Sequence, residues 1–139
     1  MNRQPDGGVN ATVTFERTLT HEEILAILRE VYDPDYRDRS VVDMGLVSAE
    51  DIEIGEERIE IEYGLTAPMC PFSAALGVMI QYALEKTLDQ AVTVRLKPGH
   101  LQEQVVNEVL SNAEKRAELL KKLEDYGLLA QCVKLTTRF

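Results

Sequence analysis

The 139-residue sequence has few of the residues on which disulfide scaffolds and metal centres are built. It contains two cysteines, Cys70 and Cys132, two histidines and no tryptophan. These four residues form no C-x-x-C pair and stand at no recognised zinc spacing, so we expect no four-ligand structural zinc site. Glycine-rich nucleotide-binding motifs are also absent. With no export signal, two cysteines indicate free thiols in a reducing compartment.

Long apolar runs and basic residues are scarce as well. No apolar run approaches the roughly 20 residues of a membrane-spanning helix, and the first ten residues lack the apolar core of a secretory signal. Lys and Arg total 15 against 24 Asp and Glu, a net charge of −9. Such an acidic domain repels nucleic acids and anionic membranes. We therefore expect a soluble, cytoplasmic protein that binds neither.

The hydrophobic content of 45% is typical of a globular domain. Residues 1–18 are polar and predict a flexible lead-in, and residues 19–139 predict a single domain. The acidity is concentrated in residues 41–66, which hold one Arg and eight carboxylates, a net charge of −7. Apolar and acidic residues alternate from Ile52 to Leu65, and this alternation predicts a β-hairpin with one solvated face. It explains these carboxylates better than a metal site does.

Helical signals flank the hairpin. A capping box at Thr20–Glu23 predicts a first helix of about 11 residues, which Pro34 ends. A second capping box at Ser111–Glu114 splits the C-terminal helical region, and Gly127 fits a helix C-terminus. The other elements that we expect are a helix over 71–88, a strand over 91–96 and helices over 101–110 and 112–125. The order α-β-β-α-β-α-α predicts an α+β fold of two layers, in which helices pack on a three- to four-stranded mixed sheet.

Cys70 is the one residue for which the sequence suggests a chemical mechanism. If Pro71 takes the first helical position, Cys70 lies at the N-cap or next to it. Backbone N–H groups and the helix dipole would then favour the thiolate and lower the pKa of the Cys70 thiol. Pro68 and Pro71 stiffen the loop, and Thr66 and Ser73 stand close enough in sequence to donate hydrogen bonds to the sulfur. The alternative is a small buried cysteine that only fills space.

Other polar residues are open to more than one interpretation. Asp43 lies in an apolar stretch and is either a capped turn residue beside Gly45 or a partly buried functional group. Asp33 and Asp35 are most simply turn residues. No histidine is tied to Cys70 by sequence. An activated thiol without a base suits soft-metal ligation or sulfur exchange better than acyl transfer.

Three segments of the chain together resemble a known family. They are Asp-Pro-Asp at 33–35, Val-Val-Asp-Met-Gly-Leu-Val at 41–47 and Leu-Thr-Ala-Pro-Met-Cys-Pro at 65–71. Their order and spacing resemble the domain shared by iron–sulfur maturation proteins, which include SufT, PaaD and the small subunit of the eukaryotic cytosolic iron–sulfur targeting complex. The resemblance runs from about residue 20 to 98. The family usually has Asp-Pro-Glu at the first segment, and Asp35 keeps the carboxylate.

The C-terminal part is similar to the tail of the eukaryotic targeting subunit. The similarity rests on Lys97–His100, Glu103 and Cys132, and it needs small gaps before His100 and Cys132. Many family members have Pro-Pro-Trp where this chain has Pro-Gly-His at 98–100, which argues against the stand-alone bacterial subgroup.

The resemblance implies a non-enzymatic factor that helps assemble iron–sulfur clusters or target them to apo-proteins. In that case Cys70 is the functional thiol and the candidate ligand of a transient iron ion or cluster. Asp43 and Thr66, with Pro68, Pro71 and Ser73, shape its pocket. The secondary candidates are Asp33, Asp35, His100, Glu103 and Cys132.

The resemblance also implies partners, a cofactor and an oligomeric state. The partners are other assembly proteins and apo-protein clients, and the chain is expected to form a homodimer. One thiolate cannot complete the usual four-cysteine shell of a cluster, so any cluster would be labile. The alternatives are an accessory subunit of a multicomponent, phenylacetate-type oxygenase, a thiol-dependent peroxidase or sulfur-transfer enzyme, and a structural domain that only mediates protein contacts.

Overall fold

The computed structural model describes residues 19–34, 36, 38–67, 72–88 and 90–136. The expected lead-in over residues 1–18 lies outside this part of the chain. The elements are α1 (His21–Leu28), the 3-10 turn η1 (Ala49–Asp51), β1 (Ile52–Ile54), β2 (Arg58–Tyr63), α2 (Ser73–Thr87), β3 (Ala91–Leu96), α3 (Glu103–Leu110), α4 (Ala113–Asp125) and α5 (Leu128–Cys132). The expected α+β class and the order α-β-β-α-β-α-α are confirmed, and α5 follows as one further short helix.

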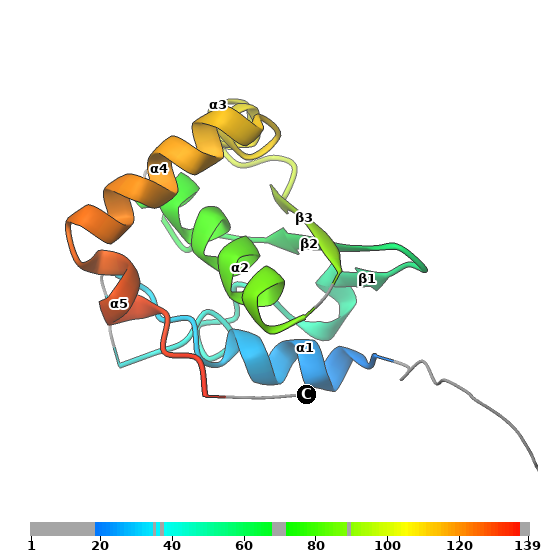
Figure 1. Cartoon of the computed structure of the whole chain (residues 1–139). Coiled ribbons are helices and arrows are strands. Elements are labelled where there is room, and N and C mark those ends of the chain that lie inside the picture. The colour runs from blue at the N-terminus through cyan, green and yellow to red at the C-terminus, as the bar shows by residue number, and fades with distance from the viewer. Residues whose placement is uncertain (1–18, 35, 37, 68–71, 89, 137–139) are drawn as a thin grey trace, which may run out of the picture.

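The three strands form one mixed sheet in the order β1-β2-β3. β1 and β2 are the antiparallel hairpin that the alternation predicts, with Ile54 opposite Ile59. β2 and β3 run parallel, so the chain must cross over between them, and α2 makes that crossover. Figure 1 shows α2 lying across one face of the sheet. The acidic residues Glu53 and Glu60 are exposed on the other face.

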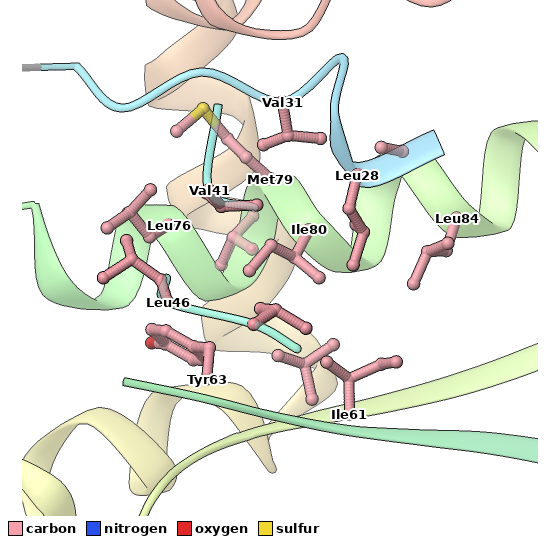
Figure 2. Packing of buried hydrophobic residues seen from close by; sticks show 14 of the residues in the cluster. Leu28, Val31, Val41, Leu46, Ile61, Tyr63, Leu76, Met79, Ile80 and Leu84 are labelled. Atoms are coloured by element: carbon pink, nitrogen blue, oxygen red, sulfur yellow. The ribbon is translucent and has the colours of Figure 1, made fainter. Parts of the chain in front are cut away.

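The hydrophobic core fills the space between α2, the sheet and α1. Figure 2 shows Leu76, Met79 and Ile80 of α2 above Tyr63 and Ile61 of β2. All five side chains are at most 1% exposed. A helix that is buried on most of its surface has no clean amphipathic stripe, which accounts for the dense apolar spacing of this segment in the sequence. Met79 is fully buried as part of this core.

Several helix boundaries differ from the sequence prediction, and those of α1 and α4 have a local explanation. α1 ends at Leu28, three residues before Val31, because Val31 forms an isolated antiparallel bridge with Val133. Pairing with a distant segment therefore overrides the helical spacing of Val31. α4 is capped by Asn112, whose side chain accepts a hydrogen bond from the Lys115 N–H, so Ser111 is not the cap residue.

The end of the chain returns to the segment that follows α1. Gly127, at φ +78°, ends α4 as expected and starts α5 directly. The Cys132 carbonyl accepts a hydrogen bond from the Tyr32 N–H at 2.7 Å, and the Lys134 N–H donates to the Glu30 carbonyl at 3.0 Å. Among the residues described, no helix has both the length and the apolar character needed to span a membrane.

Candidate functional site

The candidate site is the connection between β2 and α2, which contains Cys70. Pro68, Cys70 and Pro71 lie outside the described residues, whereas the residues on either side are described. Ala67 is exposed, and its carbonyl accepts a hydrogen bond from His100 Nε2 at 2.9 Å. Ser73 is buried, and its carbonyl accepts a hydrogen bond from the Tyr63 hydroxyl at 2.6 Å. A hydrogen bond thus holds a described residue on each side of Cys70, Ala67 before it and Ser73 after it.

His100 belongs to a tightly bonded turn between β3 and α3. Gly99 adopts φ +94°, and its N–H donates to Glu103 Oε1 at 2.9 Å. The Gln102 N–H donates to His100 Nδ1 at 3.0 Å. Asn107 joins α3 to the end of β3, since its side chain both accepts from the Leu96 N–H and donates to the Leu96 carbonyl. These bonds place the His100 ring beside Ala67.

Tyr63 fixes the other end of the segment. It is the last residue of β2 and is fully buried. A Cβ at Gly77 would come within 2.8 Å of the Tyr63 hydroxyl oxygen and 2.8 Å of a Leu110 methyl carbon. Gly77 therefore leaves the room that the Tyr63 hydroxyl needs to reach Ser73. Neither Tyr63 nor Gly77 carries a local sequence signal for this role, because the contacts with Ser73 and Leu110 depend on the fold.

The structure corrects the expected relation between Cys70 and α2. α2 begins at Ser73 with Phe72 as its N-cap, and the Leu76 N–H donates to the Phe72 carbonyl at 2.9 Å, which opens the helix there. Cys70 therefore lies two residues before the N-cap and is neither the N-cap nor its neighbour. The field of a helix dipole falls off within the first turn, so this boundary weakens the dipole argument for a low pKa of the Cys70 thiol. Phe72 itself provides no side-chain cap for the first N–H groups of α2.

The acidic candidates occupy turns. Asp43 is exposed and exchanges hydrogen bonds with Ser40, since the Asp43 N–H donates to Ser40 Oγ at 3.0 Å and the Ser40 N–H donates to Asp43 Oδ2 at 3.3 Å. This geometry favours the turn interpretation of Asp43. Asp33 also lies in a turn, and its backbone bonds to Arg39 and Tyr36, but it is buried. Asp35 lies outside the described residues.

Thr66 and Cys132 are placed differently with respect to the site. Thr66 is exposed and directly precedes Ala67. Cys132 is fully buried in α5. Figure 1 shows α5 beside the chain that follows α1, far from α3 and the end of β3. Cys132 is therefore remote from His100 and its turn.

The Asp51 carboxylate and the Lys97 ammonium form an ion pair just after the end of β3. Lys97 follows β3, and its Nζ lies 3.1 Å from Asp51 Oδ1. Partial burial alone would raise the pKa of the Asp51 carboxyl. The hydrogen bonds from Ser48 together with the Lys97 ammonium outweigh that effect, so the pKa of Asp51 lies below its ordinary value of 3.8. This ion pair joins η1 to the strand end that leads to His100.

Metal ligation cannot be assigned within this part of the chain. Among the described residues, no three His, Cys, Asp or Glu side chains are grouped so that they could hold a metal ion. Both ring nitrogens of His100 have hydrogen-bond partners, so His100 would have to give up one of them to become a ligand. The expected role of Cys70 as a transient iron or cluster ligand stays a prediction.

A comparison with protein-family models decides the family. The model of the iron-sulfur cluster assembly proteins matches residues 21–96, which is more than half of the chain. The chain belongs to this iron–sulfur cluster assembly family. The matched region runs from α1 to the end of β3 and includes Thr66, Cys70 and Ser73.

The C-terminal helices α3, α4 and α5 lie outside the region that the family model matches. His100, Glu103 and Cys132 follow residue 96, so their roles do not come from the iron–sulfur assembly family model. A search of curated proteins finds no match. The contact between His100 and Ala67 has no local signal in the sequence, because 33 positions separate the two residues.

Proposed function

We propose that this protein is a non-enzymatic iron–sulfur maturation factor that acts in the cytoplasm through the thiol of Cys70. In this role it helps assemble iron–sulfur clusters or delivers them to apo-protein clients. A cluster or iron ion is its cargo and is held only transiently. Its partners are other assembly proteins and clients, and it works as a homodimer.

The observation that carries the proposal is the family match over residues 21–96, which spans the segment with Cys70. One feature of the fold supports it. The described residues near the ends of this segment, Ala67 and Ser73, are held by His100 and Tyr63, which suits a site that is built on a fixed framework.

The motifs and the C-terminal tail refine the proposal. Their resemblance to the small subunit of the eukaryotic cytosolic targeting complex favours targeting to clients over a stand-alone bacterial role of the SufT type. A single thiolate leaves a cluster incomplete and labile, and lability suits a factor that hands its cargo on. Resemblance to PaaD keeps the oxygenase-subunit role as the alternative.

The test replaces Cys70 and measures iron–sulfur enzymes in the host. We expect Cys70→Ala to lower the activities of several iron–sulfur enzymes while the variant protein stays folded. Cys132→Ala is the matched control, since it removes the other thiol at a site remote from His100. Normal enzyme activities in the Cys70→Ala strain would contradict the proposal. A loss confined to one oxygenase would favour the oxygenase-subunit role instead.

A direct measurement on the purified protein accompanies this test. The alkylation rate of each cysteine is followed against pH by mass spectrometry on the reduced, folded chain. A functional thiolate at Cys70 reacts below the ordinary thiol pKa of about 8.5, whereas Cys132 does not. If Cys70 reacts only after denaturant is added, it is a packing residue and the thiol-based proposal is wrong.

A further inference from the structure

We propose that the cavity between α2 and α4 binds a small organic anion, which combines an apolar body, an anionic group such as a carboxylate, and one N–H or O–H donor. None of the residues that line this cavity belongs to the connection between β2 and α2. The inference therefore goes beyond the proposed function and does not depend on it.

The cavity lies between facing stripes of the two helices. One face of each helix lines it, with Val78, Gln81 and Tyr82 on α2 and Ala113, Ala117 and Leu120 on α4. Residues three, four or seven positions apart share one side of a helix, so each stripe points into the same space. The short side chains of the two alanines leave this space open. Its volume is about 340 Å³, which is within the range of sites that hold small molecules.

A buried polar atom at this cavity lacks a hydrogen-bond partner. Gln81 is only 7% exposed, and its Nε2 donates to the Val92 carbonyl at 2.9 Å and to Glu85 Oε2 at 3.3 Å. These bonds fix the orientation of the amide, because only its nitrogen can donate to a carbonyl. Oε1 of Gln81 accepts no hydrogen bond within the described part of the chain, and a buried acceptor left unpaired costs free energy. A ligand with an N–H or O–H group would supply the missing donor.

Glu85 controls access to this oxygen. Oε1 of Gln81 is covered from solvent. Glu85 is exposed, lines the cavity, and holds its carboxylate against the same amide. Its bond to Nε2 is the longer of the two, so Glu85 can turn into solvent while the bond to Val92 keeps the amide in place. The donor of the ligand then reaches Oε1.

Two cations give the cavity a charge opposite to that of the whole chain. Arg116 and Lys86 line it together with one carboxylate, that of Glu85, whereas the chain carries a net charge of −9. Arg116 Nη1 donates to the Leu110 carbonyl at 2.6 Å, which uses one of its five N–H donors and holds the guanidinium in place. Lys86 Nζ lies 5.9 Å from the centroid of the Tyr82 ring, a cation–π distance. An anionic group is therefore favoured beside these two side chains.

Two dyes with the same body test the anionic class. Anilinonaphthalene sulfonate has an aromatic body, an N–H donor and a negative charge, and phenylnaphthylamine has the same body and N–H without the charge. Fluorescence titration of the folded, full-length chain gives the Kd of each dye. We expect Lys86→Gln to weaken binding of the sulfonate about 2- to 5-fold, the range of one exposed charge pair, and to leave the neutral dye unchanged. Lys115→Gln is the matched control, because Lys115 lies on α4 but does not line the cavity. A sulfonate affinity that Lys86→Gln leaves unchanged would overturn the proposal.

Two further substitutions test the place of binding and the contact with Gln81. Ala117→Leu fills the cavity at an exposed position and should abolish saturable binding of both dyes, whereas Glu118→Leu adds the same side chain outside the cavity and should not. Glu85→Ala should tighten both dyes, because both have the N–H that Oε1 of Gln81 can accept. Saturable binding that persists in Ala117→Leu would place the dyes elsewhere and overturn the proposal. If Glu85→Ala tightened the sulfonate alone, charge would explain the gain and the contact with Gln81 would be wrong.

Discussion

At the scale of single residues, the negative charge of the Asp51 carboxylate is well compensated by its neighbours. Asp51 receives hydrogen bonds from Ser48 and lies 3.1 Å from the Lys97 ammonium. Its side chain is only 9% exposed, whereas that of Lys97 is 41% exposed. The carboxylate therefore gains more from its partners than it loses by burial, and its pKa is lowered.

The lowered pKa of Asp51 predicts how stability depends on pH. As the pH falls, the unfolded chain takes up the Asp51 proton first, near the ordinary value of 3.8. The stabilisation from Asp51 is thus fully present above that value and is lost as the pH falls through the lower, folded pKa. We expect Asp51→Asn to flatten the acid side of the stability profile, measured by urea unfolding at a series of pH values.

The control for this prediction is Glu50→Gln, which changes the exposed neighbouring carboxylate. It should leave the acid slope close to that of the wild type. An Asp51→Asn variant with the wild-type slope would show that Lys97 and Ser48 do not hold the Asp51 carboxylate in solution.

At the scale of elements, a close contact lies where α2 crosses the end of β2. Gly77 is the point at which the helix, the Tyr63 hydroxyl and Leu110 of α3 converge. The contact positions the start of α2 through Ser73. Gly77 therefore contributes to the site by leaving room for the Tyr63 hydroxyl, which bonds the Ser73 carbonyl.

We expect Gly77→Ala to destabilise the fold even though alanine favours helices by about 1 kcal/mol. The new Cβ would lie 2.8 Å from the Tyr63 hydroxyl oxygen, and overpacking typically costs about 1–3 kcal/mol. The loss should shrink in a Tyr63→Phe background, which removes the clashing oxygen. Urea unfolding of the four proteins of this double-mutant cycle measures the coupling.

Gly64→Ala is the comparison at the element scale. A Cβ there meets its nearest atoms at 3.8 and 3.9 Å, which is ordinary contact. Its effect should be small. If Gly77→Ala were as mild as Gly64→Ala, α2 and α3 would have room to shift apart at this crossing.

Sequence patterns predicted the elements well wherever the signal was local. The strand over Ala91–Leu96 matches its prediction residue for residue, since alternation and a following Pro-Gly pair mark its end. The hairpin and the Thr20 cap are confirmed for the same reason. The predicted first helix of about 11 residues would include Val31, because nothing near Val31 in sequence reveals its partner Val133, which lies about 100 positions further on.

The same limit applies to the candidate site. Cys70 stood out because prolines and a strand–helix junction lie beside it in sequence. Its expected place at the helix N-cap was wrong, since Phe72 holds that place. The resemblance named His100 as a secondary candidate, but the contacts of His100 and Tyr63 could not be predicted, because their partners Ala67 and Ser73 are determined by the fold of the sheet and of the turn after β3.

For the molecule as a whole, the reactivity of the buried Cys132 thiol measures whether α5 unfolds together with the rest of the domain. α5 is fastened to the chain after α1 by the Tyr32–Cys132 and Glu30–Lys134 backbone bonds and by the bridge to Val133. We expect Cys132 to become reactive only through global unfolding. The opening free energy from its alkylation rate should therefore equal the free energy of unfolding from urea.

The reference for this measurement is the alkylation rate of Cys132 in fully denatured protein. A smaller opening free energy would mean that α5 detaches on its own while the sheet and α2 stay folded. That result would make the C-terminal helix a separate, weaker unit.

The bridge between Val31 and Val133 also has a consequence for synthesis on the ribosome. Residues 30–33 are made early, yet Val133, which bridges Val31, and Cys132, whose carbonyl accepts from the Tyr32 N–H, are among the last described residues to be made. Until residue 133 has emerged, a nascent chain exposes the apolar surface that α5 later covers. Closing contacts so distant in sequence is slow, and this surface is the part of the newborn protein on which a chaperone would act.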